Sequence, residues 1–269
     1  MNRSVTSYAL HSKRKSLEIM TAFAAGCGGR VESVLAKALA PGDCAFFGVR
    51  PPWLGLWDQA KREKRNWYYL DNSYLDCTRE RYFRVTRNAL QCDGMNAVWN
   101  DEGAKRVKAL GVTIRDWQRG GRHVVICPQS AEFLNVVAGF EGDWLEQAVA
   151  AIKGHTDRPI VVRKKGEPRP LVADLEGAHC LVTHMSAAAV EALIAGIPVF
   201  CTGRCAAQMM GLSDLSMIET PEYPERRQEF MELLASNQWN LSEMRDGTCW
   251  RAFEEQRLRG VGHYGEGRT

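Results

Sequence analysis

The stretch AHCLVTHMSAAAVEALIAGIPVFCTG (178–203) decides the fold class of this chain. Its first seven residues form a short apolar run, which predicts a buried strand ending near Thr183. SAAAVEALIAG (186–196) consists of strong helix formers and ends at a glycine, so it predicts a helix. IPVFCTG (197–203) predicts a second strand. A strand, a helix and a strand in close succession are typical of a parallel βαβ unit.

The same alternation continues toward the N-terminus. HVVICP (123–128) and RPIVVRKK (158–165) predict two further strands, and WLEQAVAAIKG (144–154) predicts a helix between them. Strands with continuous apolar character are typical of a parallel sheet that is buried on both faces. The second half of the chain therefore predicts an α/β lobe of the Rossmann-like kind.

The first half is less regular but also combines the two element types. We predict helices at LEIMTAFAAG (17–26) and VESVLAKALA (31–40), on either side of a turn that contains Gly26, Gly28 and Gly29. The remaining predicted strands are CAFFGV (44–49), NWYYLD (66–71) and YFRVTRN (82–88), and the remaining helices are PWLGLWDQAKREK (52–64) and EGAKRVKALG (102–111).

Together these patterns predict an α/β protein with two Rossmann-like lobes, parallel sheets and C-terminal helices. The polar stretch RDWQRGGR (115–122) has the composition of a linker between lobes. We expect an N-terminal lobe over 1–118, a C-terminal lobe over 119–223, and two helical stretches with a mobile tail over 224–269. Ser242 is a plausible N-cap of the last helix.

The composition favours a folded protein of the cytoplasm. No run approaches the roughly 18 apolar residues of a membrane span, and the N-terminus has no apolar segment typical of a secretory signal, so we expect no stable membrane insertion. The nine cysteines form no CxxC pair, and several lie inside apolar runs, which indicates reduced thiols. Cys201 and Cys205 lack further metal-ligating neighbours, so no metal site is predicted.

The charge is divided unevenly. Residues 1–122 contain 21 Lys and Arg against 12 Asp and Glu, whereas the remainder contains 14 against 20. This difference suggests that the N-terminal half meets an anionic partner, although a solvated surface would also explain it.

The junction Thr183-His184-Met185-Ser186 concentrates groups that bind phosphate. A strand ends and a helix begins there, so unpaired backbone N–H groups and the positive end of the helix point to one place. Hydroxyls at Thr183 and Ser186 add donors for a phosphate or diphosphate. Glu191, little more than one helical turn further on, can accept hydrogen bonds from a ribose diol. The alternative is that Ser186 only caps the helix and Glu191 is a surface acid.

The pattern THxSx4EALx2GxPV over 183–199 resembles the donor-site segment of glycosyltransferases with the GT-B fold. It is most similar to capsule-type sugar transferases and to small glycosyltransferase-like proteins of bacteriophages. The stretches WYYLDNxY (67–74), YFRVTRN (82–88) and NQWNL (237–241) also resemble the phage proteins.

This resemblance implies a GT-B-like fold in which the C-terminal lobe binds a nucleotide-sugar donor and the N-terminal lobe binds the acceptor. The donor is a co-substrate, and no cofactor or metal is required. Cations then stabilise the departing diphosphate. Arg163 and Lys164, with Lys165 next to them, are placed for this role after their strand, and Ser130 is a further candidate phosphate contact. His184 is a candidate contact of the sugar or phosphate, although a histidine at a strand end is often structural.

A transferase that inverts configuration also needs a base for the acceptor hydroxyl. Asp71, beside Asn72 at the end of a predicted strand, is the first candidate; Asp76 and His11 are weaker ones. Asp71 could equally cap a turn. Gly28 and Gly29 could allow the backbone to approach the sugar closely, but they would also serve in a helix C-cap.

Two basic clusters predict a polyanionic acceptor. Lys61, Arg62, Lys64 and Arg65 form the first; Arg79, Arg81, Arg84 and Arg87 form the second, interleaved with Tyr74, Tyr82 and Phe83. Clustered cations bind phosphate backbones, and aromatic rings stack on bases. The first hypothesis is therefore glycosylation of a hydroxymethylated pyrimidine in phage DNA, bound by the basic N-terminal half. The alternatives are transfer to a surface glycan, a non-catalytic nucleic-acid-binding protein, and a sugar-nucleotide epimerase.

Overall fold

A computed structural model describes residues 4–75, 82–92, 97–98, 100–137 and 139–258. The chain forms two compact units, one of Met1–Leu110 with Glu232–Thr269 and one of Gly111–Met231. The chain thus changes unit after residues 110 and 231, whereas the boundaries expected from the sequence follow residues 118 and 223. Both units combine helices with a largely parallel sheet, so the predicted α/β class with two Rossmann-like folds is confirmed.

The first unit contains a six-stranded sheet of order β10-β5-β4-β3-β1-β2. Neighbouring strands among β1 to β4 pair in parallel, whereas β5 is antiparallel to both β4 and β10, so this sheet is mixed rather than purely parallel. The strands are β1 (Val5–Ala9), β2 (Arg30–Ser33), β3 (Asp43–Phe47), β4 (Trp67–Asn72), β5 (Phe83–Arg87) and β10 (Gln238–Trp239).

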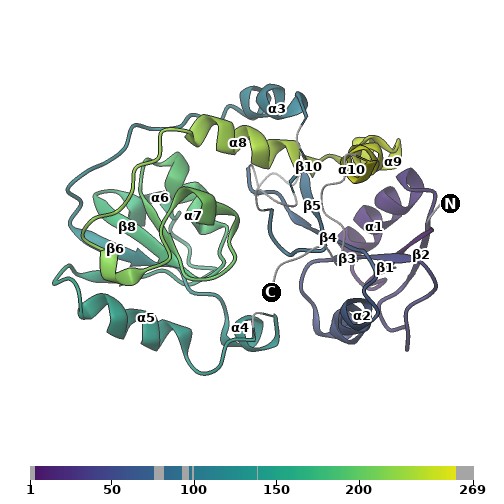
Figure 1. Ribbon diagram of the computed structural model, residues 1–269, viewed down its shortest axis with the longest axis horizontal. Coiled ribbons are helices and arrows are strands. Elements are labelled where there is room, and N and C mark those ends of the chain that lie inside the picture. Colours follow the sequence, from purple (N-terminus) through teal and green to yellow (C-terminus); the bar gives the residue numbers. More distant parts are fainter. Residues whose placement is uncertain (1–3, 76–81, 93–96, 99, 138, 259–269) are drawn as a thin grey trace. The chain divides into compact units, whose positions relative to one another are not determined.

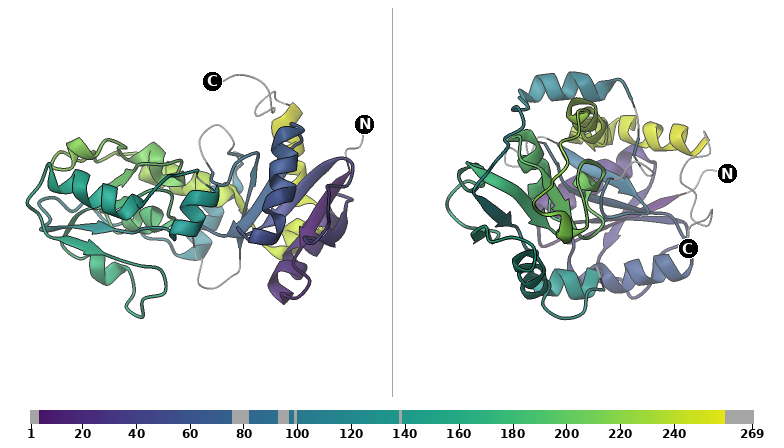
Figure 2. Two further views of the ribbon diagram at one scale, coloured as in Figure 1. Left: turned by 90° about the horizontal axis from the view of Figure 1, so that it is seen from below. Right: turned by 60° about the vertical axis from the view of Figure 1, so that its left-hand side comes forward.

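Helices cover both faces of this sheet (Figures 1 and 2). Successive side chains of a strand point to opposite faces. Tyr68 therefore contacts Phe253 of α10, with ring centroids 5.5 Å apart. Phe46 and Tyr69 contact Trp53 of α2 on the other face. The helices of the unit are α1 (Arg14–Gly26), α2 (Pro51–Arg62), α3 (Glu102–Leu110), α9 (Leu241–Arg245) and α10 (Thr248–Leu258), and α8 (Arg227–Ser236) spans the boundary between the units.

The prediction of a helix over 31–40 is wrong. Gly28 adopts a φ of 64° and turns the chain after α1, and the following residues form β2 at the edge of the sheet. Val31 of β2 pairs with Ser7 of β1, which the sequence analysis did not predict as a strand. Pairing with β1 supplies the backbone hydrogen bonds that a helix would otherwise supply, so tertiary structure overrides the local helix propensity.

The predicted last helix is divided in two. Gly247, at a φ of 83°, follows α9 and separates it from α10. The N-cap of α9 is Asn240 rather than Ser242, because Asn240 and Glu243 form a reciprocal capping box. The expected mobile tail, GVGHYGEGRT (260–269), lies outside the described residues.

The second unit contains a fully parallel four-stranded sheet of order β7-β6-β8-β9. Its strands are β6 (His123–Ile126), β7 (Ile160–Val162), β8 (Ala178–Thr183) and β9 (Val199–Cys201). Its helices are α4 (Ala131–Val137), α5 (Trp144–Lys153), α6 (Val172–Leu175) and α7 (Ala188–Ile194), followed by two short 3₁₀ helices, Ala206–Met210 and Leu215–Met217. All four strands predicted in this half are therefore present.

Candidate functional site

The second sheet has a topological switch point between β6 and β8. After β6 the chain forms β7, which pairs with β6 on the side away from β8. After β8 the chain forms β9, which pairs with β8 on the side away from β6. The connections after β6 and β8 therefore diverge and leave a crevice beyond the carboxyl ends of these strands. In open parallel sheets, ligands bind in this crevice.

Thr183 connects the loop after β6 with the loop after β8. Its side chain is fully buried at the end of β8. The hydroxyl donates a 2.6 Å hydrogen bond to the carbonyl of Cys127, just beyond β6, and accepts one of 3.3 Å from the N–H of Ser186. Because its one proton is used within the protein, Thr183 positions the two loops rather than donating to a ligand.

The backbone N–H groups of the β8–α7 loop also have partners. In the amide orientation that satisfies both of its ends, the Gln129 side-chain oxygen accepts from the N–H of Met185 (2.9 Å) and from that of Ser186. The Ser186 hydroxyl accepts from the N–H of Ala188 at 3.2 Å. The sequence predicted that these N–H groups are open to a diphosphate; in the structure, those of Met185, Ser186 and Ala188 donate to side chains of the protein. The capping role considered for Ser186 is present.

His184 lies in an aromatic environment at the same junction. Its ring contacts those of Phe140 and Trp144, with centroids 5.5 and 6.0 Å away. Its Nδ1 lies 3.0 Å from the Thr202 hydroxyl, which also accepts from the Trp144 indole at 2.9 Å. Burial lowers the pKa of the His184 imidazole, which favours the neutral ring at pH 7. Gly203 packs so closely that an added Cβ would lie 2.5 Å from the ring.

Arg163 and Glu191 carry charge near the carboxyl edge of this sheet. Arg163 follows β7, and its guanidinium donates to the buried Asp174 at 2.9 Å. The carboxyl group of Glu191 is exposed on α7, yet desolvation by the surrounding protein raises its pKa, while the charge of Arg163 acts in the opposite direction. Both charges also act on the thiol of Cys127, whose pKa burial raises to about 12. Cys127, Arg163 and Glu191 therefore lie near one another.

The two remaining donor-site candidates are exposed. Lys164 follows Arg163, and its backbone N–H donates to Glu167 at 2.8 Å. Ser130 accepts a 3.2 Å hydrogen bond from the N–H of Phe133 and thereby caps α4. This contact leaves its hydroxyl proton available to a ligand.

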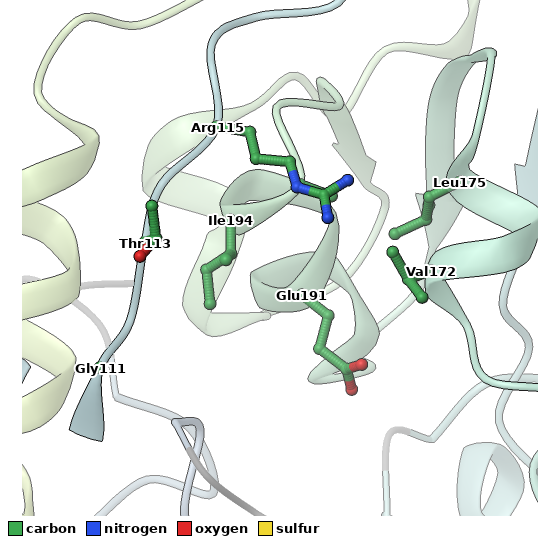
Figure 3. A pocket seen from close by; sticks show the side chains of 8 residues that line it. Gly111, Thr113, Arg115, Val172, Leu175, Glu191 and Ile194 are labelled. Carbon is green, nitrogen blue, oxygen red and sulfur yellow. The ribbon is translucent and has the colours of Figure 1, made fainter.

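A cavity of about 520 Å³ lies beside Glu191 within the second unit (Figure 3). The apolar side chains of Val172 and Leu175 on α6 and of Ile194 on α7 line it. Arg115 enters it from the segment that follows α3. From the sequence, Arg115 is predicted only as part of a linker; no local pattern marks it, because α6 and α7, which complete the cavity, come much later in the chain.

Asp71 in the first unit is held by three donors. Its carboxylate accepts hydrogen bonds from Arg84 (2.9 Å), from the hydroxyl of Tyr69 (2.8 Å) and from the N–H of Asn72 (2.8 Å). Asn72 is exposed and accepts from Lys15 at 2.8 Å. This network holds the Asp71 carboxylate in place, and its role as the catalytic base stays a prediction.

The glycine turn is not near Asp71. Gly28 and Gly29 precede β2, and a Cβ on Gly29 would lie 2.1 Å from the carbonyl of Val5 at the start of β1. Asp71 is near the end of β4, which runs parallel to β1 through β3. The turn therefore lies at the amino ends of the parallel strands, and Asp71 lies at their carboxyl ends. The glycines allow the tight turn from α1 into β2.

The described residues of the second basic cluster do not form a basic patch on the surface. Arg84 and Arg87 are only 6% and 4% exposed. Arg84 lies over the ring of Tyr74, and Arg87 donates to Gln256 at 3.5 Å. Tyr74 and Phe83 are buried as well, so they cannot stack on a base. Asp76, Arg79 and Arg81, which were also candidates, lie outside the described residues.

The first basic cluster is partly neutralised. Lys61 pairs with Asp58 at 2.7 Å and lies over the ring of Trp57. Arg65 pairs with Glu63 and donates to the carbonyl of Ala40. Arg62 and Lys64 are exposed.

The fold of the whole chain is similar to that of a known glycosyltransferase. The chain superposes on Thermosulfurimonas dismutans KpsC, beta Kdo 2,7 transferase, with a TM-score of 0.51 and 13% identity, covering 95% of this chain and 99% of that one. Its similarity to the beta Kdo 2,4 transferase of the same organism's KpsC has a TM-score of 0.48 and 14% identity, over 88% and 90% of the two chains. No family model and no curated protein matches the sequence. The fold is thus similar to that of a Kdo transferase, which agrees with the glycosyltransferase-like fold that the sequence resemblance implied. None of the described helices has the length and apolar character needed to cross a membrane.

Proposed function

We propose that this chain is a glycosyltransferase that moves a sugar from a nucleotide-activated donor to an acceptor hydroxyl. The observation that carries the proposal is Glu191: a carboxylate on α7, the helix that follows β8, lining a cavity of about 520 Å³. A cavity of this size accommodates a nucleoside. The similarity in fold to a Kdo transferase over 95% of the chain supports the same reading.

The donor's ribose hydroxyls donate to Glu191, and its phosphates lie against Arg163 and Lys164. Ser130 and Ser186 add hydrogen bonds, because each hydroxyl accepts a backbone N–H and keeps its own proton for a phosphate oxygen. These groups stabilise the charge that develops on the leaving nucleotide. Thr183 and Gln129 hold the loops that carry them. No cofactor or metal takes part in this scheme.

For the acceptor we favour an anionic glycan over DNA. Arg84 and Arg87, two of the arginines expected to contact DNA, are buried in the first unit. Other basic residues follow the parallel strands there: Lys13 and Arg14 are exposed after β1, and Arg50 follows β3. The segments that follow parallel strands all lie at the carboxyl ends of those strands. These cations therefore form a basic region there. The structurally similar protein is a Kdo transferase, and transfer of a sugar such as Kdo favours a glycan as the acceptor.

The test is incubation of the protein with a panel of CMP-, UDP- and GDP-linked sugars, with and without acidic oligosaccharides. An active transferase slowly hydrolyses its donor even without acceptor, so release of free nucleotide from one donor is expected. Conversion of the sugar without release of nucleotide would identify an epimerase. That result, or the absence of turnover with every donor, would overturn the proposal.

Site variants then connect turnover to Glu191. Glu191→Ala is expected to abolish donor binding in calorimetry and to leave the melting temperature nearly unchanged, because the side chain is exposed. Glu146→Ala, an exposed acid on α5 of the same unit, is the matched control.

A further inference from the structure

The cavity beside Glu191 has an apolar wall and two charged ends. Val172 and Leu175 of α6 and Ile194 and Ala195 of α7 supply the apolar surface. Val172 is 45% exposed although it is aliphatic, so a flat apolar ligand that covers it would remove apolar surface from water. Figure 3 shows Arg115 and Glu191 extending from different segments around this wall.

The backbone of Arg115 is fixed while its guanidinium is not. The N–H of Arg115 donates to Ile194 at 2.9 Å, and its carbonyl accepts from Arg227 at 2.7 Å. Within the described residues, the guanidinium of Arg115 makes no hydrogen bond or ion pair, and neither does the carboxylate of Glu191. Two opposite charges thus line one cavity without neutralising each other.

These features define the chemistry of an occupant. It has a flat apolar body for the wall, hydroxyl donors for the carboxylate of Glu191, and acceptors for the guanidinium of Arg115, which can only donate. A nucleoside has all three. Its base is the flat body with acceptors on its edge, and its ribose carries the hydroxyls.

We infer that this cavity binds the nucleoside of the donor and that Arg115 determines which base is accepted. The inference rests on the proposed function and deepens it. A guanidinium forms two parallel hydrogen bonds to two adjacent acceptors. Guanine offers O6 and N7, and cytosine offers O2 and N3. On adenine and uracil an N–H donor stands beside the acceptor and faces the guanidinium. Arg115 therefore selects cytosine or guanine nucleotides.

The experiment measures binding of CMP, GMP, UMP, AMP and ribose 5-phosphate to the full chain by calorimetry. For the wild type we expect CMP or GMP to bind about tenfold or more tightly than UMP and AMP, since an arginine facing a donor is left unpaired. In Arg115→Ala, the preference should fall to about threefold or less, because CMP or GMP loses its hydrogen bonds and AMP no longer leaves an arginine unpaired. Arg226→Ala removes an equally charged side chain outside the cavity of the same unit and should keep the full preference.

A second variant tests the cavity without changing charge. Val172→Phe fills it from an exposed position, so the fold should tolerate the change, and we expect affinity for every nucleotide to fall while ribose 5-phosphate is affected less. If the wild type turns over a donor but Arg115→Ala keeps its base preference, or Val172→Phe binds normally, this inference fails and the proposed function stands. If the wild type neither binds nucleotides nor hydrolyses any donor, both fail.

Discussion

The hydroxyl of Thr183 donates a 2.6 Å hydrogen bond to the carbonyl of Cys127, and so joins the carboxyl end of β8 to the loop that follows β6. These two strands flank the switch point of the second sheet. The bond thus sets the spacing of the two loops on which Ser130 and Ser186 stand. It is the contact on which the geometry of the proposed donor site depends.

Thr183→Val should destabilise the protein by about 1 to 3 kcal/mol, because the carbonyl of Cys127 and the N–H of Ser186 lose a buried partner. Urea unfolding measures the loss. Thr220→Val, an exposed control in the same unit, should change stability by less than about 0.5 kcal/mol. Equal stability of the two variants would mean that water replaces the hydroxyl at the switch point.

Asp71→Asn separates a structural role from a catalytic one. The substitution leaves the buried Arg84 without its ion pair, so we expect a loss of about 2 to 3 kcal/mol in the free energy of unfolding. Asp58→Asn breaks an exposed pair with Lys61 and should cost less than about 0.5 kcal/mol. A variant at Asp71 with unchanged stability and no transfer activity would support the prediction that Asp71 is the catalytic base.

Glu191 should make stability and nucleotide binding respond to pH in opposite directions. Its pKa is raised by desolvation, so the folded state favours the protonated form. The free energy of unfolding therefore gains a contribution as the pH falls through this raised pKa toward the ordinary value of about 4.3. Nucleotide binding uses the charged carboxylate and weakens over the same range.

Glu191→Gln removes both effects. The variant should be at least as stable as the wild type at pH 7, and its weak nucleotide binding should change less with pH than that of the wild type, because the nucleotide phosphate still titrates but residue 191 does not. Urea unfolding and calorimetry at pH 7 and pH 5 check this. A variant clearly less stable at pH 7 would show that the carboxylate has a stabilising partner.

Gly203→Ala should displace the ring of His184. The added Cβ would lie 2.5 to 2.7 Å from three ring atoms, so overpacking should cost about 1 to 2 kcal/mol. The chemical shifts of the imidazole protons should move with it. Gly55→Ala is the control, since no atom lies within 4 Å of its Cβ and alanine favours the surrounding helix α2. It should stabilise the protein by about 0.5 to 1 kcal/mol.

The sequence by itself determined the four strands of the second unit and two of its helices, α5 and α7, but not α4, α6 or the two 3₁₀ helices. Its strands are continuous apolar runs, and its helices consist of helix formers that end near glycines, so each element is specified by residues next to one another. The alternation of these elements then fixes a parallel sheet. The candidate residues from Ser130 to Ser186 could be named for the same reason, because they lie at or just after strand ends, whereas Glu191 was named for its place in the helix that follows β8.

Tertiary structure decided the remaining features. VESVLAKALA has the composition of a helix, yet its first residues become β2 because β1 offers them an edge to pair with. Arg84 and Arg87 have the spacing of a basic surface, but β5 lies inside the sheet and turns them toward Asp71 and Gln256. Arg115 gains its place only when α6 and α7 close around it. Local sequence sets backbone preference and polarity, whereas burial and charge pairing depend on partners distant along the chain, and only the folded arrangement supplies those partners.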